Sequence, residues 1–126
     1  MTAPERRVLL VEDEDVLRAL LCRVLERAGC AVTSARDGDE ALRLFEAGPG
    51  FDAAVLDVGA PPAGAAATLR ALRARRADLA AVLISGSGPD GEVAAFLRDG
   101  RSAFLSKPFH PDELPRALAA LGVGAR

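Results

Sequence analysis

Five short, nearly continuous apolar runs divide this chain, and segments with the periodicity of amphipathic helices separate them. The runs span residues 8–11, 30–35, 53–58, 80–85 and 103–106. Because they do not alternate between polar and apolar residues, they are typical of strands covered on both faces. Strict alternation of strand and helix with short connections predicts an α/β fold: a parallel sheet with right-handed crossovers and helices on both faces.

The helical segments carry one apolar face each. In the first, six residues are predicted to form the inward stripe: Val16, Leu17, Leu20, Leu21, Val24 and Leu25. Gly29 suits the position just after that helix, and 37–40 has the capping character of a second helix start. A third helix over about 65–76 is predicted to turn its arginines outward to solvent. The last is predicted to begin at His110-Pro111, with a start distorted by Pro115.

Length and composition bound the class of protein. The 126 residues suit one domain, which we predict to fill 1–126 with a core over about 7–121 and no output domain. A net charge of −2 gives no basic excess, so direct nucleic-acid binding is not expected. No apolar run approaches the about 18 residues that cross a membrane, and the N-terminus lacks signal-peptide organisation. Cys22 and Cys30 lack metal-site spacing and are predicted to be small core residues in a reducing cytoplasm.

Four of the five predicted strands end in an ionisable or hydroxyl side chain. Glu12 and Asp13 follow the first strand, Asp57 lies at the end of the third, Ser85 ends the fourth and Lys107 follows the fifth. In open α/β sheets, ligands bind outside the carboxyl ends of the strands. Lys107 is the only lysine beside fifteen arginines, which favours a site needing a compact ammonium over a solvated strand-end lysine.

Three clustered carboxylates repel one another unless cations lie among them, so this edge predicts a divalent ion, Mg²⁺, beside the lysine. Asp13 and Asp57 are the candidate direct ligands, Glu12 a ligand through a bound water, and the carbonyl of Gly59 a backbone ligand. Asp57 can then attack a phosphoryl group as a nucleophile. The metal, the lysine ammonium and the serine hydroxyl would share the developing charge.

Four stretches in this order and spacing resemble response-regulator receiver domains over essentially the full chain. They are VLLVEDE at 8–14, VLDVGAP at 55–61, LISG at 83–86 and FLSKPF at 104–109. The resemblance implies a flavodoxin-like (βα)5 fold, a doubly wound five-stranded parallel sheet with strand order 2-1-3-4-5.

The resemblance also implies a role for each site residue. Asp57 would be the phosphoacceptor, Ser85 the switch hydroxyl, Lys107 the lysine that contacts the phosphate, and Glu12 and Asp13 the acidic pair. A cis peptide bond would join Lys107 to Pro108, and Phe104 would be the aromatic switch residue.

The function implied is Mg²⁺-dependent transfer of a phosphoryl group to Asp57 from a phosphohistidine, held by a histidine kinase or a histidine phosphotransfer protein. Phosphorylation would shift a protein-interaction surface made of the fourth helix, fifth strand and fifth helix. Such a chain is a phosphoacceptor rather than an enzyme, cytoplasmic and without membrane insertion. Its downstream target is a protein of unknown identity, and a weak or phosphorylation-dependent dimer stays an open alternative.

The loop after Asp57 departs from the family pattern. Ala60 replaces the usual Met, Pro61 and Pro62 stand together, and Ala65 occupies a position that is usually Gly. An alternative function is therefore a phosphorylation-independent interaction module that keeps the fold. A phosphatase is disfavoured, because Gly59 stands where such enzymes commonly carry an acid.

Overall fold

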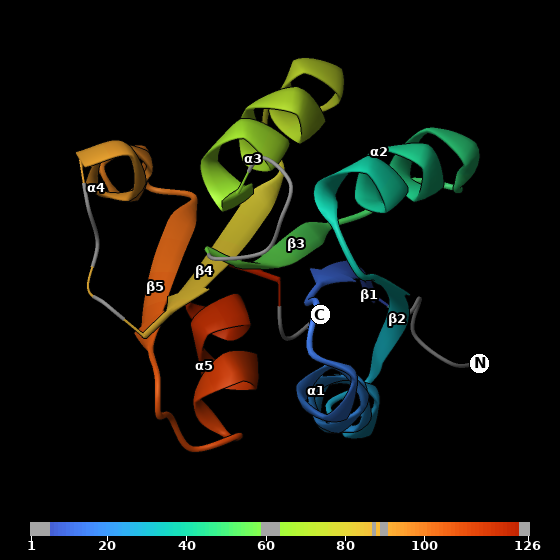
Figure 1. Ribbon diagram of the computed structural model, residues 1–126, viewed down its shortest axis with the longest axis vertical. Coiled ribbons are helices and arrows are strands. Elements are labelled where there is room, and N and C mark those ends of the chain that lie inside the picture. Colours follow the sequence, from blue (N-terminus) through green and yellow to red (C-terminus); the bar gives the residue numbers. More distant parts are fainter. Residues whose placement is uncertain (1–5, 59–63, 87, 89–90, 124–126) are drawn as a thin grey trace.

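The computed structural model describes residues 6–58, 64–86, 88 and 91–123, and within these ranges strands and helices alternate strictly (Figure 1). The strands are β1 (Arg6–Val11), β2 (Cys30–Ala35), β3 (Ala53–Asp57), β4 (Ala80–Ser85) and β5 (Ser102–Ser106). The helices are α1 (Asp15–Arg27), α2 (Gly38–Ala47), α3 (Gly64–Arg75), α4 (Gly91–Leu97) and α5 (Glu113–Ala120). One parallel sheet has the order β2-β1-β3-β4-β5, which confirms the predicted fold class.

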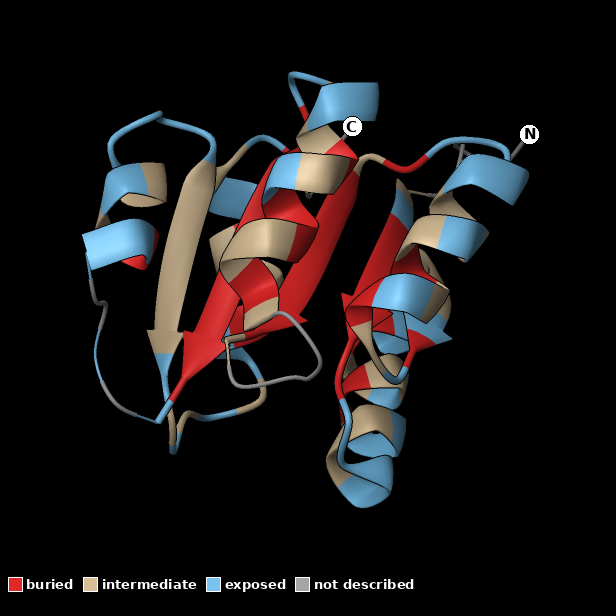
Figure 2. Cartoon of the chain, turned by 45° about the horizontal axis from the view of Figure 1, so that its top comes forward, coloured by how far each residue is buried: buried red, intermediate tan, exposed pale blue. Residues whose placement is uncertain are grey.

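The sheet separates two apolar layers, with α2, α3 and α4 on one face and α1 and α5 on the other (Figure 1). In β1, Leu9 and Val11 pack into the first layer, while Val8 and Leu10 pack into the second. The central strands β3 and β4 are buried along their whole length, as Figure 2 shows. The edge strands β2 and β5 are mostly half-buried, so the prediction of two covered faces is wrong for them.

The predicted inward stripe of α1 is wrong for two of its residues. Leu21 and Leu25 are buried against the sheet, but Val16 is 77% exposed and Leu20 is 46% exposed. Consecutive residues project about 100° apart around a helix axis. Val16 and Leu20 therefore lie on the flank of α1, where the described part of the chain leaves them uncovered.

The start of α5 is also wrong in the prediction. The helix begins at Glu113 rather than at His110-Pro111, so Pro115 is its third residue. A backbone N–H in the first turn has no intrahelical acceptor, so proline there removes no helical hydrogen bond. His110 instead organises the approach to the helix: its N–H donates to the Glu113 carboxylate (2.7 Å), and its Nδ1 accepts from the Asp112 N–H (3.2 Å).

The outward, solvated arginine face predicted for the third helix is wrong for Arg73, whose side chain is only 11% exposed, whereas the other three side chains are at least 38% exposed. All four arginines of the predicted helix form ion pairs, which the sequence did not indicate. The ion pairs are Arg70–Glu92, Arg73–Asp99, Arg75–Glu46 and Arg76–Asp78. These pairs connect α3 to α2, to the loop before β4, and to α4 and the turn after it.

Other helix ends follow the predictions. The Asp37 carboxylate accepts a hydrogen bond from the Glu40 N–H (2.8 Å) at the start of α2, and Gly29 after α1 has φ +94°. Cys22 and Cys30 are free thiols that are half-buried at the edge of the second apolar layer. Within the described ranges, no helix has both the length and the apolar character needed to cross a bilayer.

Candidate functional site

Parallel pairing brings the ends of four strands to one edge of the sheet, as predicted. Val11 pairs with Leu56 and Asp57 pairs with Ile84, so Glu12 and Ser85 lie at nearly the same level as Asp57. The hydrogen-bond ladder continues past the strands: Val58 N–H donates to the Ile84 carbonyl (2.7 Å) and Lys107 N–H to the Ser85 carbonyl (2.8 Å). The pairing of β3 with β4 and of β4 with β5 therefore extends past the last residues of these strands.

The carboxylates of Glu12, Asp13 and Asp57 form one cluster, in which one oxygen from each lies within 4.8 Å of the others. Glu12 and Asp57 are buried, at 1% and 8% exposure, whereas Asp13 is exposed. Glu12 Oε2 accepts a hydrogen bond from the Glu14 N–H (3.0 Å), but Oε1 is buried without a hydrogen-bond partner in the described structure. A buried carboxylate oxygen in that state needs a proton, a cation or a cation-bound water.

The pKa of Glu12 is consistent with an unsatisfied buried carboxylate. Burial is the main cause that raises the pKa of Glu12 to about 7; the hydrogen bond from Glu14 and the charge of Lys107 lower it, and the neighbouring Asp57 carboxylate raises it. Near neutral pH, a proton on Glu12 and a cation among the carboxylates are therefore alternatives. All ligand atoms offered here are oxygens, which is the donor set that Mg²⁺ prefers, so the residues present fit this ion.

Lys107 reaches the cluster from the end of β5. Its Nζ donates to Asp57 Oδ2 at 2.9 Å, and the side chain is 31% exposed. Burial by itself lowers the pKa of the ammonium, but the hydrogen bond and charge of Asp57, with the charges of Glu12 and Glu14, raise it overall above its usual value. The Lys107–Pro108 peptide bond is cis, in agreement with the prediction.

The two predicted switch residues lie beside the cluster rather than in it. Ser85 is the last residue of β4 and is 5% exposed. Phe104 is half-buried in β5, in register with Leu83, and packs into the layer beneath α2, α3 and α4. Gly59, the predicted backbone ligand, and the loop positions Ala60 to Pro62 lie outside the described residues.

The sequence reasoning missed two features. The first is Arg18, whose Nη1 donates to the Glu12 carbonyl (3.0 Å) while Nη2 pairs with Asp15 (2.6 Å), so it braces the acidic turn. An arginine three residues after Asp15, one helical turn away, could have signalled the pairing with that aspartate.

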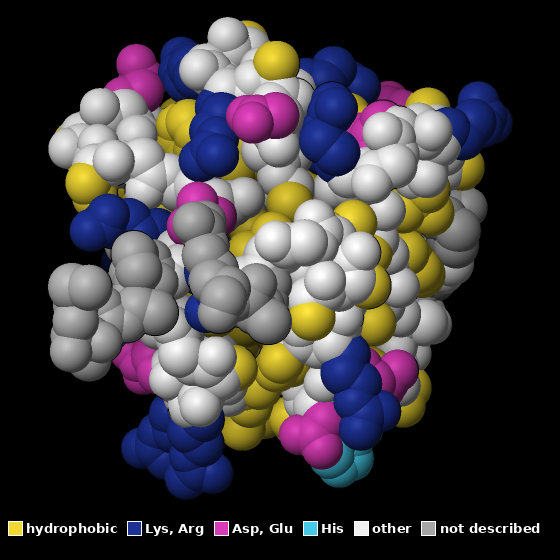
Figure 3. Space-filling model, turned by 180° about the vertical axis from the view of Figure 1, so that it is seen from behind, with side chains coloured by type: hydrophobic (Ala, Val, Ile, Leu, Met, Phe, Trp, Pro, Cys, Tyr) yellow, Lys and Arg dark blue, Asp and Glu magenta, His cyan; other side chains and the backbone are white. Residues whose placement is uncertain are grey.

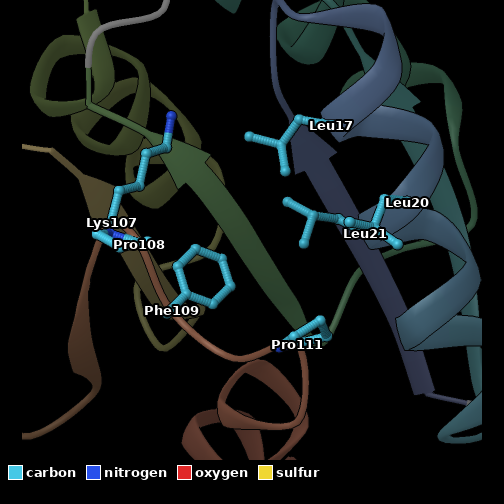
Figure 4. Close-up of a pocket in the computed structure, with 7 residues that line it drawn as sticks. All are labelled: Leu17, Leu20, Leu21, Lys107, Pro108, Phe109 and Pro111. Atoms are coloured by element: carbon cyan, nitrogen blue, oxygen red, sulfur yellow. The ribbon is translucent and has the colours of Figure 1, made fainter.

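The second is an apolar groove of about 380 Å³ between α1 and the segment that precedes α5 (Figure 4). Its lining residues are Leu17, Leu20, Leu21, Lys107, Pro108, Phe109 and Pro111. Lys107 forms the end of the groove beside Asp57, and the Phe109 ring faces the leucines of α1. From behind, hydrophobic side chains gather at the lower edge of the molecule near its histidine (Figure 3).

Comparison with known proteins identifies the family. A family model for the response regulator receiver domain matches residues 8–119. The transcriptional regulatory protein TcrA of Mycobacterium tuberculosis is 36% identical over 115 residues, which cover 91% of this chain and 45% of TcrA. The sensor kinase CckA of Brucella abortus is 37% identical over 108 residues, 85% of this chain and 11% of CckA. The chain thus spans less than half the length of these two relatives.

Solved structures agree. Chemotaxis protein CheY4 of Vibrio cholerae superposes with a TM-score of 0.84 at 25% identity, covering 94% of this chain and 99% of that one. A Burkholderia pseudomallei response regulator, crystallised with a phosphorylated aspartic acid and a calcium ion, gives 0.78 at 26% identity, covering 90% and 66%. With the family model matched over most of the chain, the protein belongs to the response regulator receiver domain family of two-component signalling.

Proposed function

We propose that this chain is a phosphoacceptor, in which Asp57 takes a phosphoryl group from a phosphohistidine of a histidine kinase or a histidine phosphotransfer protein. One observation carries the proposal. Asp57 is a buried carboxylate at the end of the central strand, 2.9 Å from the only lysine ammonium and clustered with two more carboxylates. A structural strand-end aspartate has no need of these companions.

Lys107 holds the Asp57 carboxylate through its hydrogen bond to Oδ2. In the transfer, one oxygen of this carboxylate attacks phosphorus. That oxygen forms a P–O bond as the P–N bond to the donor histidine breaks, and the imidazole leaves with the electron pair. Lys107 and the Ser85 hydroxyl then take up the charge of the phosphoryl oxygens. The phosphoryl group stays attached to Asp57 as an aspartyl phosphate. The chain therefore acts as a phosphoacceptor in signalling and not as an enzyme.

Glu12, Asp13 and Asp57 would hold Mg²⁺, with Glu12 acting through a bound water. When bound, the ion would neutralise the carboxylates and the incoming phosphoryl oxygens. The unsatisfied Oε1 of Glu12 supports this assignment. The calcium ion and phosphorylated aspartate in the Burkholderia relative are consistent with it.

A protein donor needs a surface beside the reacting carboxylate, and α1 offers one. Val16 and Leu20 are the large apolar side chains most exposed in the described structure, and both lie on this helix. Leu20 borders the groove that ends at Lys107 and also two neighbouring hollows along α1. We propose that a helix of the phosphohistidine donor packs on this surface, which would bring the donor imidazole over Asp57.

Phosphorylation would draw Ser85 toward the aspartyl phosphate and let Phe104 repack, which would alter the surface formed by α4, β5 and α5. The phosphorylation-independent module is less well supported, because the acidic cluster and its lysine are complete. The single-domain organisation without an output domain, the cytoplasmic location and a weak or phosphorylation-dependent dimer stay predictions.

The first prediction concerns the acceptor. With Mg²⁺ present, acetyl phosphate should add one phosphoryl group to the wild type, as measured by intact-protein mass spectrometry. Asp57→Asn and chelation of the metal should each abolish the addition, whereas Asp39→Asn, an exposed carboxylate on α2, should not. Absence of any label on the wild type with Mg²⁺ present contradicts the proposal.

The second prediction concerns the unique lysine. Lys107→Arg keeps the charge, but the planar guanidinium is too wide for the place of the ammonium. Because a charged hydrogen bond contributes about 1.5–3 kcal/mol, the equilibrium for switching after labelling should fall about tenfold or more. NMR shifts of α4, β5 and α5 on phosphorylation measure this. A variant that labels and shifts like the wild type would mean that the lysine is incidental.

The third prediction separates docking from chemistry. Leu20→Ser should raise KM for a phosphorylated histidine phosphotransfer protein that labels the wild type, by about tenfold, because a buried leucine contributes about 1.5–3 kcal/mol at an interface. Labelling by acetyl phosphate should be unchanged. Arg43→Ser, an exposed position on α2, is the matched control. Equal KM values for Leu20→Ser and the control would place the donor elsewhere.

A further inference from the structure

Apolar packing alone does not hold α4 in place. The helix has seven residues, and only Val93 among them is buried, whereas α3 buries four of its residues. A helix this short is not stable without tertiary contacts. Other contacts must therefore fix α4 against the rest of the domain.

Those contacts are two ion pairs and two cation–π contacts between α3 and the segment formed by α4 and the turn after it. Glu92, Phe96 and Asp99 follow one another at spacings of four and three, so they lie along one side of α4 and of the turn after it. On α3, Arg70 and Arg73 are one turn apart and face them. Arg70 Nη2 pairs with Glu92 at 3.2 Å, and Arg73 pairs directly with Asp99.

Phe96 lies between the two ion pairs. The guanidinium carbons of Arg70 and Arg73 are 5.9 Å and 5.8 Å from the centre of its ring, a cation–π distance for both. Phe96 is half-buried and also packs against the core layer under α3. The aromatic ring thus joins the two ion pairs into one contact surface.

The two ion pairs differ in solvent exposure and in the number of supporting hydrogen bonds. The Arg73 side chain is only 11% exposed, and its guanidinium also donates to the Leu79 carbonyl (2.8 Å) and to Ser102 Oγ (3.0 Å). Asp99 is held in turn by the Arg101 N–H (2.7 Å). By contrast, the Arg70 and Glu92 side chains are 57% and 63% exposed, and such solvent-exposed pairs are weak.

The weaker ion pair, Arg70–Glu92, lies at the end of α4 that is nearer to Ser85 along the chain. Glu92 is in the first turn of α4, which follows β4 and Ser85 along the chain, while Asp99 comes after the last turn and leads into β5. A movement that breaks Arg70–Glu92 and keeps Arg73–Asp99 would swing the first turn away from α3. The hollow of about 510 Å³ between these helices, which Arg70, Phe96 and Asp99 help to line, is where such a movement would begin.

We infer that α4 is a hinged helix, with Arg73–Asp99 as the hinge and the Arg70–Glu92 pair with Phe96 as the latch. The hinge and latch belong to the unphosphorylated protein. Only their coupling to Asp57 rests on the proposed function, because release of the latch would free the helix that follows Ser85.

The test is amide hydrogen exchange of the unphosphorylated protein by NMR. Arg70→Gln removes the exposed pair and one cation–π contact, and Phe96→Leu removes both cation–π contacts. In each variant, amides 95–97, whose helical acceptors lie in the first turn, should therefore exchange roughly three- to tenfold faster. Amides of α3 and α5 should be unchanged. The matched control is Arg75→Gln, which removes a comparably exposed pair between α3 and Glu46 of α2. If α4 exchanges alike in the control and in the two latch variants, the latch does not exist.

The hinge has its own readout. The amides of Arg98 and Asp99 donate to the carbonyls of Ala95 and Phe96 in the last turn. Arg70→Gln should leave the exchange of these two amides slow. Arg73→Gln should accelerate their exchange as well as that of amides 95–97. Uniform acceleration along α4 in Arg70→Gln would mean that the helix detaches as a whole and does not pivot. These results do not depend on labelling of Asp57, so a failure of phosphorylation and a failure of the hinge remain distinguishable.

Discussion

The site depends on one unbalanced group of charges: three carboxylates held at the end of a parallel sheet against one ammonium. Strand pairing alone brings Glu12, Asp13 and Asp57 together, because every parallel strand ends at the same edge. Lys107 neutralises Asp57 by a direct hydrogen bond. Glu12 is left buried with an unsatisfied oxygen and a pKa raised to about 7. The fold thus maintains a site that favours added positive charge, which a bound cation would supply.

The surfaces on the two sides of this edge differ in their side chains. On the α1 side the surface is apolar, with Leu20 at its centre and Lys107 at its end, which suits a protein that must approach Asp57 closely. On the α4 side, exposed ion pairs and an aromatic ring supplement the burial of Val93, and solvent-exposed pairs contribute little to stability. Under the proposed function, the phosphoryl group would be delivered on one side of Asp57 and the response would take place on the other.

Much of this could be predicted because the signals are local. The strands are continuous apolar runs that stop at charged or hydroxyl residues, so their ends and the candidate site residues follow from the sequence. Helical periodicity identified a shared face on α1 but not whether another element covers it, which is why Val16 and Leu20 were misplaced. The ion pairs of Arg70 and Arg73 do not follow from the sequence, because their acidic partners lie more than twenty residues away along the chain. The raised pKa of Glu12 arises from burial, which sequence alone does not give.

The most direct test of the charge imbalance is a titration of the Glu12 side-chain carboxyl by carbon-13 NMR, with and without Mg²⁺. Since its pKa in the fold lies above the ordinary value of 4.5, the stability linked to Glu12 is present below pH 4.5 and is lost as the pH rises through about 7. Without divalent ions Glu12 should titrate near pH 7, and saturating Mg²⁺ should lower that midpoint by more than about one unit, because the ion favours the charged carboxylate. A midpoint near 4.5 in the metal-free protein, or one that Mg²⁺ does not move, would contradict the account.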